Sequence, residues 1–213
     1  MRRLLALIAL VLAGSIGNAQ AATITFEDLA LDENGGDKIS GGFLFDSATN
    51  HLHISTTQWN TTNGTQIMLI DSVGGTHPPD ANAVTVSQIG GAPFALSSID
   101  ISEAHSDSFF SARQVQITGN VFGGGTVSAL LVLDNNLVNG VLGNYFQTFL
   151  FNPAFGNLSS FTLTGMGALC CTTSNYFAID NVVVASAVPE PGTLSLVALG
   201  SAYLFRRRQR KRH

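Results

Sequence analysis

The chain has 213 residues and a net charge of −4, but this total hides a strong segregation of charge. Residues 22–187 contain only two basic side chains, Lys38 and Arg113, and thirteen of the fourteen acids, so this body carries 2 − 13 = −11. Phosphate binding requires neutralising cations, and the composition therefore argues against a nucleic acid or an anionic lipid surface as the partner of the body. An acidic body would instead attract cations.

The chain opens with the three-part layout of a secretory signal peptide. Arg2 and Arg3 precede an apolar run from Leu4 to Ala13, and small residues follow up to Ala21. The run is too short to cross a bilayer, and an Ala-x-Ala cleavage site follows it, so a signal peptide is favoured over a membrane helix. We expect residues 1–21 to be removed and the mature protein to be exported.

The body, residues 22–187, predicts one all-β domain. Short segments with period-2 or β-rich character alternate with turns rich in Gly, Asn and Asp, and no convincing helix interrupts them. The spacing indicates an antiparallel β-sandwich of jelly-roll type. The expected strands lie within residues 23–29, 42–46, 51–57, 65–71, 83–89, 94–102, 114–122, 126–134, 145–152, 160–165 and 176–185.

The last 26 residues, 188–213, read as a membrane segment. Thr193 to Phe205 is an uncharged, mostly apolar run of about 20 Å as a helix, against a hydrocarbon core of about 30 Å. Six basic residues follow it and would stay on the cytoplasmic side. An amphipathic surface helix is the weaker alternative, because the run has no polar stripe.

This end resembles the PEP-CTERM sorting signal of Gram-negative bacteria. Pro189, Glu190 and Pro191 precede the short apolar segment and the Arg-rich end, in the order of that family. The resemblance implies recognition by an exosortase, cleavage near Pro189, and release from an inner-membrane-anchored precursor to the cell surface or matrix. Such proteins accompany exopolysaccharide and biofilm.

The two ends of the body carry a second resemblance. Ile-Asp-Asn-Val in the last strand and Phe-Glu-Asp near the start are similar to the terminal strands of several carbohydrate-binding modules. That resemblance implies a structural calcium ion held by Glu27 and Asp180, with Asp28 as a possible helper. Calcium takes six to eight oxygen ligands, which two strands and nearby carbonyls could supply. The alternative is that these acids only cap strand ends.

Carbohydrate binding would require an exposed aromatic ring with polar neighbours. Trp59 lies in a strongly polar stretch, beside Gln58 and Asn60, and these three residues are the candidate sugar contacts; Asn63 could add a hydrogen bond. Burial of Trp59 is an equally reasonable expectation, because its area rewards packing in a core. Tyr145 and Tyr176 are weaker candidates.

The remaining chemistry-bearing residues favour structural roles. Cys170 and Cys171 are the only cysteines, and in an oxidising compartment they would form a vicinal disulfide or bridge to another chain. His51 and His53 would share one strand face, which we expect to be solvated, since no third metal ligand is evident.

No catalytic motif was found, so no catalytic residues are assigned. Glu103 and Asp107, with His105, fit an acidic loop better than a glycosidase pair. Three classes stay open: a polysaccharide-binding module, a structural or adhesive matrix protein without a defined ligand, and, least favoured, a secreted glycan-active enzyme.

Overall fold

The computed structural model describes residues 21–32, 35–47, 52–57, 62–71, 83–104, 109–135, 145–169 and 175–186. They belong to one compact unit, residues 19–186. Residues 1–18 and 187–213 lie outside the described residues, so the structure does not test the predicted signal peptide or the predicted membrane tail.

The described residues form twelve strands and a single 3-10 turn, which confirms the all-β antiparallel prediction. Each of the eleven expected segments overlaps a strand, and among the described strands only the three-residue β2 was not predicted. The strands are β1 (Ala21–Ile24), β2 (Lys38–Ser40), β3 (Phe43–Asp46), β4 (Leu52–Ser55), β5 (Ile67–Ile70), β6 (Ala83–Gln88), β7 (Phe94–Glu103), β8 (Gln114–Val121), β9 (Thr126–Val132), β10 (Gln147–Leu150), β11 (Leu158–Met166) and β12 (Phe177–Ser186), and the 3-10 turn η1 is Pro153–Phe155.

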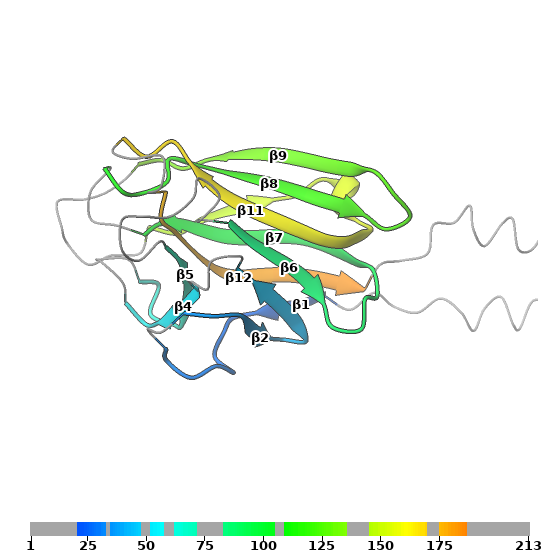
Figure 1. Cartoon of the computed structure of the whole chain (residues 1–213), viewed down its shortest axis with the longest axis horizontal. Helices are drawn as coiled ribbons and strands as arrows, with labels where there is room; N and C mark the ends of the chain where they lie inside the picture. The colour runs from blue at the N-terminus through cyan, green and yellow to red at the C-terminus, as the bar shows by residue number, and fades with distance from the viewer. Residues whose placement is uncertain are drawn as a thin grey trace, which may run out of the picture. The chain divides into compact units, whose positions relative to one another are not determined.

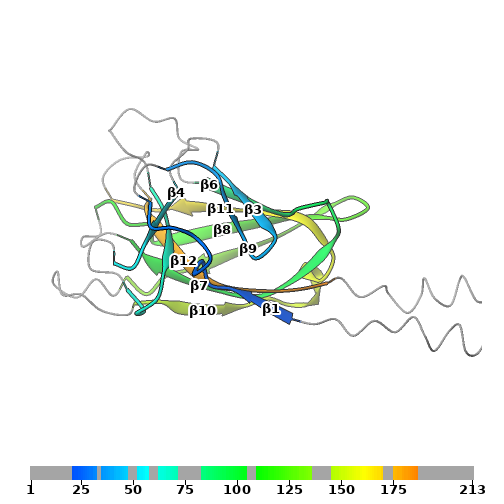
Figure 2. The ribbon, with the colours of Figure 1, turned by 90° about the horizontal axis from the view of Figure 1, so that it is seen from below.

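The strands pack as two layers of a sandwich (Figures 1 and 2). One layer has the order β2-β3-β6-β11-β8-β9, and the other contains β4, β5, β12, β7 and β10, with β1 beside β12. A single residue pair, Leu158 with Phe94, joins the layers through β11 and β7. All of these strand pairs are antiparallel, so side chains alternate between the core and the outer faces.

The space between the layers is filled by apolar side chains. Phenylalanines from several strands interlock there: the ring of Phe94 lies 5.0 Å from Phe43 and 6.1 Å from Phe161, both edge-on. Phe26 and Phe45 make a similar contact at 5.2 Å. Aromatic pairs of this geometry add about 1 kcal/mol each to the area they bury. The core is therefore an aromatic layer that fixes the spacing of the two sheets.

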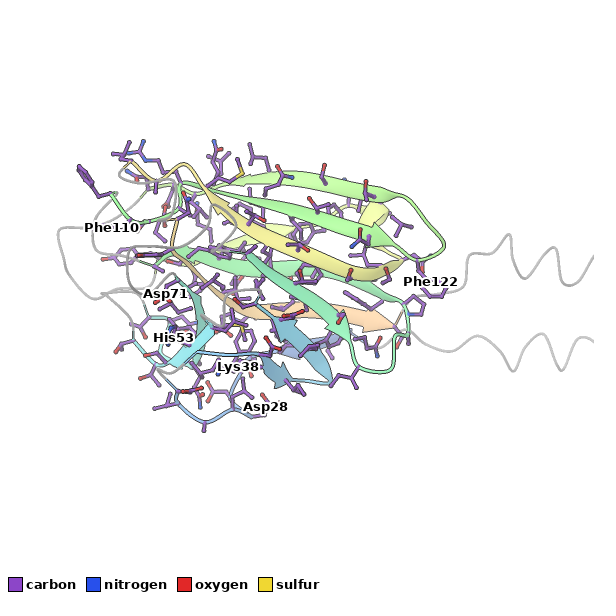
Figure 3. The ribbon with its side chains drawn as sticks, viewed as in Figure 1. Asp28, Lys38, His53, Asp71, Phe110 and Phe122 are labelled. Carbon is purple, nitrogen blue, oxygen red and sulfur yellow. The ribbon has the colours of Figure 1, made fainter. Side chains whose placement is uncertain are left out.

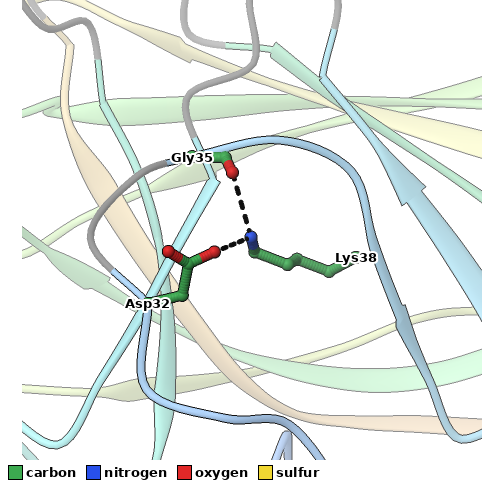
Figure 4. Close-up of polar contacts among 3 residues, drawn as sticks. All are labelled: Asp32, Gly35 and Lys38. Atoms are coloured by element: carbon green, nitrogen blue, oxygen red, sulfur yellow. Dashed lines mark hydrogen bonds and ion pairs between the residues drawn. The ribbon is translucent and has the colours of Figure 1, made fainter.

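One of the two basic residues of the body has a structural role. The Nζ of Lys38 donates to Asp32 Oδ2 at 2.5 Å and to the carbonyl of Gly35 at 3.2 Å (Figure 4). Asp32 in turn pairs with Ile54 through two backbone hydrogen bonds. Lys38 thereby ties the segment before β2 to the edge strand β4.

The last strand changes neighbours halfway along, and this change positions a site. Its first residues, Phe177–Ile179, pair with β5, and residues from Val182 to Ala185 pair with β1 on the same edge. Between them the register shifts after Asp180, and Asn181 adopts a φ of 47°. The segment that leaves β1 and the segment that enters β5 therefore both arrive at Asp180.

Candidate functional site

The outer face of the layer β2-β3-β6-β11-β8-β9 presents an array of hydroxyl and amide side chains, with Asp46 of β3 at its border opposite Thr85. On β6, β11, β8 and β9 the inward residues are apolar or glycine, and the outward residues between them are mostly polar, with Leu130, Val132 and Met166 as the exposed apolar exceptions. We define the polar face by ten of these outward residues: Thr85, Ser87, Thr126, Ser128, Ser160, Thr162, Thr164, Gln116, Thr118 and Asn120. None of the ten is buried.

The register arranges this polar face in rows across the strands. Thr162 lies opposite Thr85 on one side and Thr118 on the other, and Ser128 continues the row. The hydroxyls of Thr85 and Thr162 are 2.9 Å apart, and Asn120 Nδ2 donates to Ser160 Oγ at 2.9 Å. Because neighbouring strands lie about 4.8 Å apart, the face offers regularly spaced donors and acceptors.

A second arrangement of polar groups lies at the change of neighbours in β12. Asp180 is fully buried, and its Oδ2 accepts hydrogen bonds from Asn63 Nδ2 at 2.5 Å and from Thr65 Oγ1 at 3.0 Å. Its Oδ1 is buried without a hydrogen-bond partner. One residue further along, the backbone N–H of Gln66 donates to Glu27 Oε1 at 2.7 Å. The structure thus brings Glu27 and Asp180 to one loop, residues 63–66.

The Gln66 side chain closes this junction. Its amide nitrogen donates hydrogen bonds to the carbonyl oxygens of Leu29 and Phe26, at 3.1 and 3.3 Å. Among the described residues no three His, Cys, Asp or Glu side chains gather as metal ligands. A cation here would therefore depend on amide and carbonyl oxygens together with Asp180 and Glu27, the ligand types that calcium prefers.

Asp28 is engaged elsewhere. Its two oxygens accept hydrogen bonds from Ser40 Oγ at 2.5 Å and from the N–H of Gly41 at 3.1 Å. The bond from Ser40 is the largest influence on Asp28 and lowers the pKa of that carboxyl. Asp28 therefore closes the β2–β3 turn, and the structure offers no support for the expectation that it assists a calcium ion.

Two other carboxyl groups, those of Asp180 and Glu103, are buried, and burial shifts their pKa values. Burial raises the pKa of Asp180, while the hydrogen bond from Asn63 opposes that shift. Burial likewise raises the pKa of Glu103, whose Oε1 accepts the N–H of Asn135 at 2.6 Å. Glu103 therefore fixes the end of β9 and is not part of an exposed acidic loop. The expected neighbours His105 and Asp107 lie outside the described residues.

The prediction of a solvated histidine face is wrong for His53. This side chain is buried, and its Nε2 lies 3.1 Å from Asp71 Oδ1 (Figure 3). The pattern was misread because β4 is packed on both sides: Leu52, His53 and Ile54 are all buried. A histidine inside such a strand needs a polar partner, and the aspartate that follows β5 provides it.

Several predicted site residues lie outside the described residues: Trp59, Gln58 and Asn60, the cysteines Cys170 and Cys171, His51, and the motif Pro189, Glu190 and Pro191. Asn63, a weaker sugar candidate, donates its amide to Asp180. Tyr176 stacks on Phe110 at 6.2 Å. None of the helical structure among the described residues has the length and hydropathy needed to cross a membrane.

Sequence comparison identifies the class of protein through its carboxyl end. Residues 187–211 match the PEP-CTERM protein-sorting motif. The chain is thus an exosortase-targeted surface protein, and the matched segment covers the three parts recognised in the sequence. No curated protein has a sequence that matches the chain significantly.

Solved structures resemble the sandwich only in fold. A DUF4465 family protein from Bacteroides caccae gives a TM-score of 0.46 at 14% identity, over 78% of this chain and 98% of that one. The module CBM32-3 from a family 31 glycoside hydrolase of Clostridium perfringens gives 0.37 at 16%, over 60% and 80%. A Stig cyclase from Fischerella sp. TAU gives 0.40 at 13%, over 78% and 98%. Because one fold can serve many functions, the function is inferred from the site.

Proposed function

We propose that the mature protein is a non-catalytic matrix component that binds a neutral exopolysaccharide through the polar face. The observation that carries this proposal is the concentration of ten uncharged hydroxyl and amide side chains on one open sheet face of a domain with a charge of −11. A neutral polyol matches such a face in hydrogen bonding and is not repelled by the acidic remainder. An anionic glycan would be.

We expect each row of the polar face to bind a sugar unit weakly, so that retention depends on several rows binding one polymer. A protein hydrogen bond contributes about 0.5–1.5 kcal/mol net, because it replaces bonds to water. The polar face itself contains no aromatic ring on which a sugar could stack. Several rows engaging successive units of one polymer would add avidity without high affinity for a single sugar.

A retention experiment tests this proposal. Residues 22–187 are run through gels containing the host's own exopolysaccharide, and migration is compared with that of Thr85→Val, Thr118→Val and Thr162→Val combined. Valine keeps the shape and strand preference of threonine but removes the hydroxyl, so we expect retention to fall at least fivefold. Thr23→Val, which removes an exposed hydroxyl on β1, is the control and should be retained like the unmodified domain.

The two remaining functional classes predict other results in the same experiment. Unretarded migration of the unmodified domain would refute the binding proposal and leave a structural matrix protein without a ligand. Release of reducing sugar from the polysaccharide would refute the non-catalytic assignment. Equal retention of the triple variant and the Thr23→Val control would place binding elsewhere than on the polar face.

We further propose a precursor that is exported through residues 1–21 and held in the inner membrane of a Gram-negative host by residues 193–205. An exosortase would then cleave near Pro189, Glu190 and Pro191. The sorting motif supports this order of events, which can be followed by the size and location of the chain in cells with and without the exosortase. Replacing Glu190 by Ala should accumulate the uncleaved, membrane-associated form; normal release would contradict the assignment.

Calcium binding at Asp180 and Glu27 is a third proposal. The fully buried Asp180 Oδ1, which has no hydrogen-bond partner, supports it, because a cation would satisfy that oxygen. An ion there would supply charge neutralisation and would join the end of β1, the entry to β5 and the middle of β12. We assign it a structural role.

A further inference from the structure

One end of the sandwich is tied closely to the sorting motif by chain continuity. β12 ends at Ser186, opposite Phe94, and β1 begins beside it, with Ala21 opposite Ala185. Pro189 is the third residue after Ser186. Three residues span at most about 10 Å when extended, so whatever holds the motif keeps this end of the domain within about that distance.

Four loops build this end, which we call the tip: residues 41–42, 89–93, 122–125 and 151–157. Hydrogen bonds join them in pairs, from the N–H of Ile89 to the carbonyl of Gly42 at 3.0 Å and from the N–H of Phe122 to the carbonyl of Asn157 at 2.8 Å. Figure 3 shows Phe122 at this end and Phe110 at the opposite end.

The composition of the tip differs from that of the rest of the domain. None of its 18 residues is charged, although the body contains thirteen acids. Ile89 is 53% exposed and Phe122 is 49% exposed, each on a loop with consecutive glycines. One carboxylate is hydrogen-bonded to the tip, that of Asp28, which accepts the N–H of Gly41 at 3.1 Å.

We propose that the tip rests on the bilayer interface while the precursor is anchored, with Ile89 and Phe122 inserted among the lipids. This inference rests on the membrane-held precursor proposed above. The contact is apolar, which agrees with the scarcity of cations in the body. Two half-exposed side chains bind lipid weakly on their own, but the tether of six residues, 187–192, between Ser186 and the membrane segment makes the encounter intramolecular and gives a high effective concentration.

This contact would give the domain a fixed orientation and would keep the sorting motif at the membrane surface. Cleavage near Pro189 removes the tether, and with it the effective concentration that sustains the contact. The released domain would therefore leave the bilayer without any further change in its structure. The tip would act only during processing.

The test uses residues 22–213 reconstituted in phosphatidylcholine vesicles, with and without bromine on the acyl chains. Trp59 is replaced by Phe, and a single tryptophan is placed at Phe122, at Ile89, or, as the matched control at the opposite end, at the 55%-exposed Phe109. A fourth variant, Tyr203→Trp, reports insertion of the tail. Circular dichroism spectra of all variants should match that of the unmodified chain.

We expect brominated lipid to reduce the tryptophan fluorescence at least twofold in Phe122→Trp, Ile89→Trp and Tyr203→Trp. In Phe109→Trp we expect it to reduce the fluorescence by less than a tenth. Quenching at Tyr203→Trp but at neither tip position would overturn the tip contact and leave the anchored precursor standing. Equal quenching at Phe109→Trp and the tip would also overturn it. No quenching at Tyr203→Trp would overturn the anchored precursor, and the tip contact with it.

Discussion

Replacing Asp180 by Asn tests the junction in β12 most directly. The substitution keeps the shape of the side chain, and the remaining oxygen can still accept the hydrogen bonds from Asn63 and Thr65. It replaces the unpartnered Oδ1 with an amide nitrogen, which cannot bind calcium. In the chelated domain the variant should be at least as stable as the parent, because it removes a fully buried carboxylate.

With calcium present the expectation reverses. Calcium at 100 times its Kd stabilises the folded state by about 2.7 kcal/mol. For a domain of this size, 1 kcal/mol shifts Tm by about 2–4 °C, so the parent should gain about 5–11 °C. The Asp180→Asn variant should lose most of that gain. The effect of Asp180→Asn on Tm should therefore change sign between chelator and calcium. A residue that only packs would give the same effect on Tm in both conditions.

The assay is thermal unfolding of residues 22–187, followed by circular dichroism in chelator and in calcium. Asp100→Asn is the matched control. Asp100 lies opposite Asp180 on β7, and its oxygens accept hydrogen bonds from Thr148 and Asn181, so its replacement should leave the calcium-induced shift intact. A parent Tm that is the same in both conditions would refute the calcium site. Equal loss of the shift in Asp100→Asn would show a general charge effect.

Three further results are expected. Burial raises the pKa of Glu103 and of Asp180, so the folded state takes up protons at a higher pH than the unfolded chain does; the stability of the chelated domain should rise as pH falls through their folded pKa values toward the ordinary pKa values of the unfolded chain, and guanidinium unfolding at several pH values should show no such rise if both titrate normally. Gly165→Ala should lower the free energy of unfolding by about 3 kcal/mol or more, since its Cβ would meet the carbonyl oxygen of Asn175 at 2.3 Å, whereas the Cβ of Gly119→Ala would meet movable side-chain ends at 2.8 Å and should cost about 1–3 kcal/mol; equal losses in thermal unfolding would contradict this ranking. Lys38→Met should cost about 1 kcal/mol in urea unfolding by leaving Asp32 without its ion pair, and a neutral result would mean that the pair only offsets its own desolvation.

The fold was predictable because the alternation of apolar and polar residues that marks a strand can be seen within each short segment of the sequence. In residues 83–88 and 158–166, Val, Phe and Leu alternate with Ser and Thr, and the structure turns the first set inward and the second set outward. The short strand β2 was missed because its three residues, one of them lysine, carry no alternation of their own. It forms because β3 supplies a partner and Lys38 is held by Asp32.

The site was predictable only in part, because it depends on which strands become neighbours. The sequence indicated Glu27 and Asp180 as partners, and the structure brings both to residues 63–66. It gave no sign that the Gln66 amide would donate to the carbonyls of Leu29 and Phe26, since this depends on which segments meet beside β5. The polar face was likewise missed: its alternation was visible strand by strand, but the rows exist only once the register is known.

The polar face and the tip can act at the same time because they lie on different sides of the domain. The rows of the polar face cross β6, β11, β8 and β9, whereas the tip caps the ends of the strands. A domain that touches a bilayer with its strand ends holds its sheets away from the surface, so the polar face stays open to polymer outside. Binding of polysaccharide therefore need not wait for cleavage. An anchored precursor should retain the host polymer on vesicles as well as the released domain does in a gel, and a precursor that binds only after removal of residues 188–213 would show that the face is covered while the tail is present.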